Sequence, residues 1–175
     1  MKNKHNTKKL TVNAMMAALG VVILYLGSFI ELLDISMAIA ASMIAALIVI
    51  EYGGAAPWSV YGVTSILSLL LLPQKLPALM YAVFFGYYPI IKERLEKIKS
   101  KIIQWIIKLA IFNIATLLLL LLMSLFTVEA PEGFSLKVAF IALSNLMLIL
   151  YDIAMTRVVS YYIFRLRHRV KKIFK

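Results

Sequence analysis

Asp152 is the residue whose surroundings raise the first chemical question. It lies within the run LILYDIAMTR, residues 148–157, which is otherwise mostly apolar. If the apolar segments on either side of residues 127–135 form antiparallel helices, Asp152 lies at the level of Lys108. An unpaired charge in a lipid-embedded helix costs about 2.5–3.5 kcal/mol or more. The sequence therefore predicts a Lys108–Asp152 ion pair, which is either a structural clasp between two helices or part of a functional site.

A second group of residues predicts a pocket for a small molecule. Glu31 and Asp34 lie in one short connection, Glu129 lies in another, and Tyr81 and Asn145 lie in apolar segments near these connections. Aromatic walls with a few polar groups are typical of ligand pockets, so these residues predict a site for an aromatic or cationic molecule. For each aromatic residue, packing or anchoring at the membrane interface is the alternative. Tyr81 also belongs to a stripe at helical spacing, which consists of Gln74, Ala78, Tyr81, Phe85 and Tyr88.

Catalytic and metal-binding signatures are missing from the sequence. It contains no HExxH, no GxSxG and no glycine-rich phosphate loop. It has no cysteine, and its two histidines lie near the basic ends of the chain. We therefore expect no enzyme, no metal and no other cofactor. A membrane-embedded enzyme acting on lipid is a third hypothesis, but it would need several acid, base or metal ligands at one depth.

The elements that must position these residues are membrane-spanning helices. The chain of 175 residues is 63% hydrophobic and only 15% charged. About 20 apolar residues in a helix cover the hydrocarbon core of a bilayer. The sequence predicts an all-α integral membrane protein, a compact single domain over residues 1–175. Its six expected transmembrane helices are Leu10–Ile30, Ile35–Ile50, Ala55–Leu72, Leu76–Ile91, Ile103–Phe126 and Leu136–Phe164.

The positive charges predict the orientation of these helices. The net charge is +11, and most Lys and Arg residues lie in the basic ends, residues 1–9 and 165–175, and in the connection 92–101. Positive charge is retained in the cytoplasm, so both termini are expected there, in a multi-pass protein of the cell membrane. We expect these charges to contact anionic lipid headgroups and not nucleic acid. Residues 90–106 are either a partly interfacial helix or a solvated connector.

Small residues mark a surface for another helix on the first predicted span. Ala14 and Ala18 lie four residues apart, which lets a second helix approach closely because no large side chain separates the backbones. With the six-span layout, the basic start and the length, this motif resembles the substrate-binding S components of energy-coupling factor (ECF) transporters.

The resemblance implies a function, partners and a place for the ligand. In that family the Ala-x-x-x-Ala face docks on a transmembrane coupling subunit, which works with two ATPases. The ligands are mostly water-soluble vitamins, bound near the outer surface under the loop between spans one and two, against spans four to six. The implied mechanism is ligand capture, followed by toppling of the whole bundle in the membrane.

A structural or scaffold membrane protein without a small-molecule ligand is the alternative. It predicts that the outer aromatic and acidic residues are packed or solvated, with no cavity between them.

Overall fold

The computed structural model describes residues 2–125 and 133–168, and every regular element in this part of the chain is helical. The all-α prediction is confirmed. In a lipid-embedded segment, a helix satisfies the backbone polar groups within the segment itself. The elements are α1 Lys2–Gly27, the 3-10 turn η1 Glu31–Leu33, α2 Asp34–Glu51, α3 Ala56–Leu71, α4 Leu76–Met80, the π-helical turn η2 Tyr81–Phe85, α5 Tyr88–Leu95, α6 Lys101–Leu125, α7 Phe134–Tyr161 and the π-helical turn η3 Tyr162–Leu166.

Four helices are long and apolar enough to cross a membrane. Their apolar parts are Thr7–Gly27, Asp34–Glu51, Lys101–Met123 and Ser135–Arg165. The length and composition of these helices match what a bilayer requires of a spanning helix. α3 is apolar but shorter, and the fourth predicted span is divided among α4, η2 and α5. Six crossings and the side of each terminus stay predictions.

The π-helical turn η2 interrupts the fourth predicted span. The backbone N–H that follows η2 donates to the carbonyl of Tyr81 at 2.7 Å, a bond between residues five apart. The Tyr61 hydroxyl donates to the carbonyl of Ala82 at 2.8 Å, and the Tyr151 hydroxyl donates to the carbonyl of Phe85 at 3.4 Å. Tyrosines of α3 and α7 therefore bond to carbonyls of this irregular turn, which keeps buried backbone oxygens satisfied.

Gly86 lets two tyrosine rings approach the backbone just after η2. A Cβ at this position would lie 2.7 Å from the Tyr61 ring and 2.8 Å from the Tyr81 ring. Real Cβ atoms do not come so close to ring carbons, so any other residue here would displace α3 or the rings.

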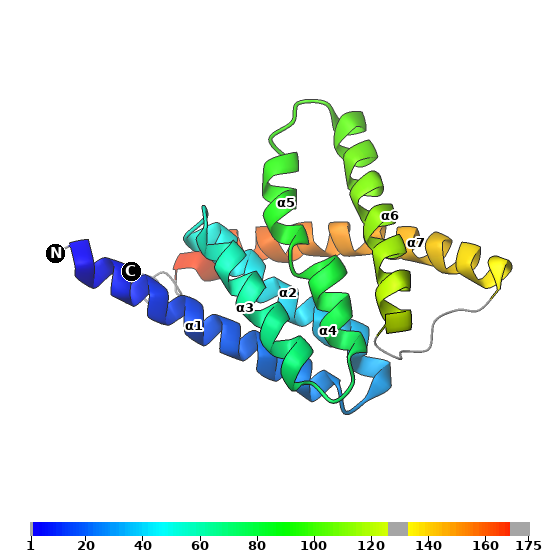
Figure 1. Cartoon of the computed structure of the whole chain (residues 1–175). Helices are drawn as coiled ribbons and strands as arrows, with labels where there is room; N and C mark the ends of the chain where they lie inside the picture. Colours follow the sequence, from blue (N-terminus) through cyan, green and yellow to red (C-terminus); the bar gives the residue numbers. More distant parts are fainter. Residues whose placement is uncertain (1, 126–132, 169–175) are drawn as a thin grey trace.

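The helices form two groups that meet along α2. α1 packs against α2 and α3, and Figure 1 shows these three helices running alongside one another. α2 also contacts α4 and α5, while α7 passes behind α5 and α6 in the view of Figure 1. α7 crosses α6 beside Asn113, whose side-chain amide exchanges two hydrogen bonds of 3.1 Å with that of Asn145.

The start of α1, the end of η3 and the α2–α3 connection meet at one end of the molecule, the terminal end. Arg167 Nε donates to Glu51 Oε1 at 3.0 Å, and Lys9 Nζ lies 5.2 Å from the centroid of the Tyr52 ring. Figure 1 shows η1 and the α3–α4 connection at the opposite end, the loop end. Because α5 ends at Leu95 and α6 begins at Lys101, residues 90–106 do not form one continuous interfacial helix.

Candidate functional site

Asp152 is the centre of a buried cluster of charged and polar side chains from three helices. Lys108 Nζ in α6 donates to Asp152 Oδ1 at 2.9 Å, so the predicted ion pair is present. The same oxygen accepts a bond of 2.5 Å from the Tyr88 hydroxyl and one from Lys92 Nζ, both in α5. We call these four residues, Tyr88, Lys92, Lys108 and Asp152, the charge cluster.

The charged side chains of the cluster are buried and their donors are largely used, and Lys92 also borders a groove between α2, α5 and the end of α7. The side chains of Lys92, Lys108 and Asp152 are 6%, 4% and 9% exposed. Lys92 Nζ also donates to the backbone carbonyl of Asp152 at 3.2 Å and pairs with Glu96 Oε1 at 3.0 Å. A lysine has three N–H donors, so Lys92 has none left for a ligand. Removing one partner from such a buried group typically costs about 3–5 kcal/mol.

The sequence does not predict Lys92 and Tyr88 as partners of Asp152. Lys92 begins the basic connection 92–101, whose charges predict the orientation of the chain in the membrane. The signal that could have found it is periodic, since Lys92 follows Tyr88 by four residues and so continues the stripe through Tyr81, Phe85 and Tyr88. These stripe residues are buried, and so are most residues between them, so this span is buried on more than one side.

The described residues predicted to bind a ligand do not line a common cavity. Asp34 is buried at the start of α2, and Tyr81 is only 1% exposed, with its ring centroid 6.2 Å from that of Tyr61. Asn145 is bonded to Asn113. The side chain of Glu31, which begins η1, and the whole of Glu129 lie outside the described residues.

A cavity of about 220 Å³ nevertheless lies towards the loop end, lined by immediate neighbours of these predicted residues. Ile35, Met80 and Ser144 line it, and they are adjacent in sequence to Asp34, Tyr81 and Asn145. Consecutive residues in a helix point about 100° apart. The cavity therefore borders the helix segments that carry the predicted residues, but on neighbouring faces of these helices.

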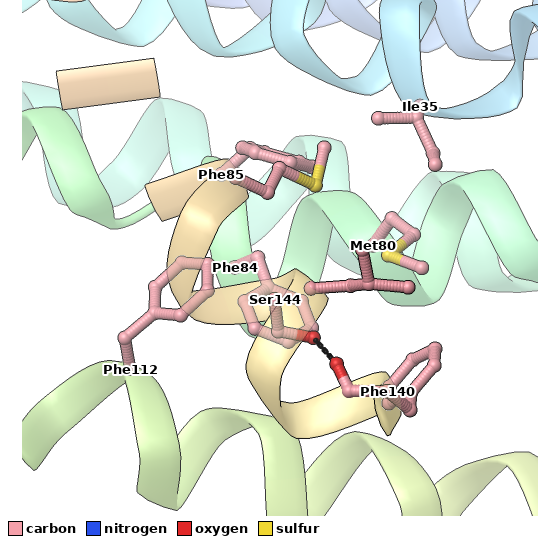
Figure 2. Close-up of a pocket in the computed structure, with 9 residues that line it drawn as sticks. Ile35, Met80, Phe84, Phe85, Phe112, Phe140 and Ser144 are labelled. Atoms are coloured by element: carbon pink, nitrogen blue, oxygen red, sulfur yellow. Dashed lines mark hydrogen bonds between the residues drawn. The ribbon is translucent and has the colours of Figure 1, made fainter. Parts of the chain in front are cut away.

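The walls of this apolar cavity are mainly aromatic and thioether side chains. Four of the nine lining residues are phenylalanines from η2, α6 and α7, and Ile35, Leu143 and two methionines also line the cavity. Figure 2 shows the phenylalanines and Met80 around the space, with Ser144 hydrogen-bonded across one turn of α7 to the carbonyl of Phe140, at 2.8 Å. Within the described part of the chain, none of the lining residues is charged. The aromatic lining residues are Phe84, Phe85, Phe112 and Phe140.

A short series of rings lies between the apolar cavity and the charge cluster. Phe85, in the cavity wall, contacts Tyr151 with ring centroids 4.9 Å apart. The Tyr151 ring lies 5.2 Å from the ring of Tyr88, whose hydroxyl bonds Asp152. The Tyr151 hydroxyl lies 2.8 Å from Ser42 Oγ in α2. Tyr151 therefore contacts both regions and ties them to α2.

The predicted docking residues lie on the outside of α1. Ala14 and Ala18 are both exposed, and Ala14 borders a groove of about 130 Å³ between α1 and α3. Small side chains such as Ala17 and Ser59 also line this groove. The face is therefore open to another helix.

Metal chemistry finds no support among the residues that the structure describes. No group of three or more His, Asp or Glu side chains in this part of the chain is placed to hold a metal ion.

In comparisons with known proteins, no family model, no curated protein and no solved structure matches this chain.

Proposed function

We propose that this protein is the substrate-capture subunit of an ECF-type transporter, which binds a small vitamin or related micronutrient at the outer face of the cell membrane. The observation that carries this proposal is the position of the apolar cavity. It lies between the start of α2, η2, α6 and the first half of α7. The resemblance implies a ligand in the same place, beneath the first connection and against spans four to six.

The proposed topology has six crossings with both termini in the cytoplasm. Contacts of Lys9 with Tyr52 and of Arg167 with Glu51 support it, because they hold the two ends of the chain at the terminal end. The basic residues of both ends would then face the cytoplasm, as insertion favours. The loop end, with the apolar cavity near it, would face outwards.

The proposed mechanism is capture followed by reorientation of the whole bundle. The exposed Ala14 and Ala18 face of α1 would dock on the coupling subunit, and two ATPases would supply the energy. A bundle that tilts through lipid needs its buried charges paired. The hydrogen bonds of Lys92 and Lys108 to Asp152 are consistent with that requirement.

The experiment is to purify the protein, release bound compounds and identify them by mass spectrometry. We expect one vitamin-sized compound at close to one per chain. Ser144→Phe, which fills the apolar cavity, should abolish its recovery, whereas Ala142→Phe, on an exposed position of the same helix, should not. Repeated emptiness, with no thermal shift across a vitamin panel, would refute ligand capture.

A scaffold protein is the second candidate, and one observation favours it. Asp34 and Tyr81 are buried and Asn145 is paired, as expected for packed residues.

The two proposals also differ in whether the protein assembles with a coupling subunit. Replacing Ala14 and Ala18 with tryptophan should prevent co-purification with a coupling subunit while ligand recovery persists; unchanged assembly would remove the role proposed for this face.

A further inference from the structure

We infer that the ligand of the apolar cavity is a neutral aromatic molecule of about two fused rings that carries one N–H or O–H hydrogen-bond donor. This inference rests on the proposed function and narrows the class of substrate. Of the two alternatives that the sequence predicts, an aromatic or a cationic molecule, it selects the aromatic one.

The neutrality of the ligand follows from the lining. Side chains of phenylalanine, methionine, isoleucine and leucine form the cavity wall, together with the single hydroxyl of Ser144. A charged group moved from water into such surroundings loses its hydration and finds no partner, which is strongly unfavourable. The buried lysines of the charge cluster, Lys92 and Lys108, are already bound to Asp152.

The size of the ligand follows from the volume. An engineered cavity of about 150 Å³ lined by Leu, Ile and Phe is known to bind benzene. The apolar cavity has about 220 Å³, so one ring would leave it underfilled. A fused two-ring molecule such as indole, or one ring with a short substituent, fits this volume better.

The aromatic character follows from the arrangement of the rings and sulfurs. Phe84 and Phe112 lie 4.5 Å apart between centroids at an interplanar angle of 51°, so they present both ring faces and ring edges to neighbours. Aromatic pairs favour offset and edge-to-face contacts, which a planar guest can complete. Met80 and Met147 add polarisable sulfurs, which pack well against aromatic rings.

The single donor follows from the hydrogen bond of Ser144. Its hydroxyl hydrogen is used in the bond to the carbonyl of Phe140. A serine hydroxyl has one donor and two acceptor lone pairs, so only acceptor capacity remains for a ligand. A ligand with an N–H or O–H group can bond to this oxygen, whereas a ligand with acceptors alone cannot.

An entrance to the cavity lies beside two exposed lining residues. Ile35 is 39% exposed and Leu143 is 65% exposed, although both line the cavity. They belong to the start of α2 and to α7, so a guest can enter between these helices near the loop end.

The test compares indole with indene, which has nearly the same shape but no N–H group. Binding of each to the purified full-length protein is measured by equilibrium dialysis. We expect both to bind, with indole tighter. Ser144→Ala should weaken the binding of indole by roughly three- to tenfold, the usual net effect of one hydrogen bond. The binding of indene should not change. Ser144→Phe should remove binding of both, and Ala142→Phe should preserve it.

The possible outcomes separate this inference from the proposed function. Release of a charged or strongly polar vitamin from the purified protein would overturn the inference and leave ligand capture standing. Equal effects of Ser144→Ala on indole and indene would overturn the assigned hydrogen bond. If lipid acyl chains alone are recovered and indole does not displace them, or if nothing binds, the inference and the capture function both fall.

Discussion

The charge cluster and the apolar cavity lie close together in one helical bundle, and they are built by opposite means. In the charge cluster, each buried polar group has a partner, and three helices converge on one carboxylate oxygen. In the cavity, apolar side chains leave a space, and the one hydroxyl bonds within its own helix. The difference indicates that the first region holds α5, α6 and α7 together, while the second is available to a guest.

Among changes in the two regions, Asp152→Leu is expected to lower the stability of the protein most. This change leaves two buried lysines, Lys92 and Lys108, without their shared anion. We expect a loss of about 3–5 kcal/mol in the free energy of unfolding, measured by chemical denaturation in detergent. The matched control is Lys97→Met in the exposed Lys97–Glu93 pair, where about 0–1 kcal/mol is expected. Similar losses in both variants would show that the charge cluster is not a structural clasp.

A charge swap sharpens the assignment of partners. Lys108→Asp combined with Asp152→Lys restores the original pair in reverse order. We expect only partial recovery of stability relative to the single changes, because the new cation in α7 would face Lys92. Adding Lys92→Met to the swap should recover more, as measured by the same denaturation curves. Full recovery by the double change alone would mean that Lys92 contributes little.

Gly86→Ala tests the packing of the tyrosine rings beside η2. The turn η2 also forms part of the cavity wall. The added methyl group would lie within 3 Å of the Tyr61 and Tyr81 rings. Overpacking of this kind costs about 1–3 kcal/mol, visible as a lower melting temperature. Gly62→Ala in α3 is the control, because nothing lies within 4 Å of its added Cβ. There we expect no loss, since alanine favours a helix.

Tyr151→Phe tests the residue that contacts both regions. It removes the hydroxyl near Ser42 and the weak bond to the carbonyl of Phe85, and it keeps the ring contacts. We expect a loss of about 0.5–1.5 kcal/mol by thermal denaturation. Binding of a guest in the apolar cavity should change little. A large change in binding, with stability unaffected, would instead mean that the hydroxyl shapes the cavity.

The smallest effect on stability is expected for Ser144→Ala. The lost bond joins the hydroxyl to a carbonyl one turn earlier, and that carbonyl still has its helical partner. We expect a change within about 0.5 kcal/mol. A loss comparable with that of Asp152→Leu would contradict the distinction between a clasp and a cavity.

Much of the fold could be predicted because a lipid environment allows a chain only a few backbone structures. Long apolar segments must become helices, since no water is present to satisfy their backbone groups. The pairing of Lys108 with Asp152 could also be predicted, because a buried charge needs a partner and both residues lie close to the point where α6 and α7 cross. The role of Lys92 could not, because its position beside a cluster of basic residues equally suited a solvated connection.

The sequence by itself determined the all-helical architecture, the apolar helices and the need to pair Asp152. Only the tertiary structure decided the rotation of each helix, which placed Ile35, Met80 and Ser144 in the cavity instead of Asp34, Tyr81 and Asn145. The physical reason is that in a lipid-embedded bundle polar side chains gain most from one another at helix contacts. Apolar side chains line the space that remains beside those contacts. The position of this space depends on how all the helices pack together.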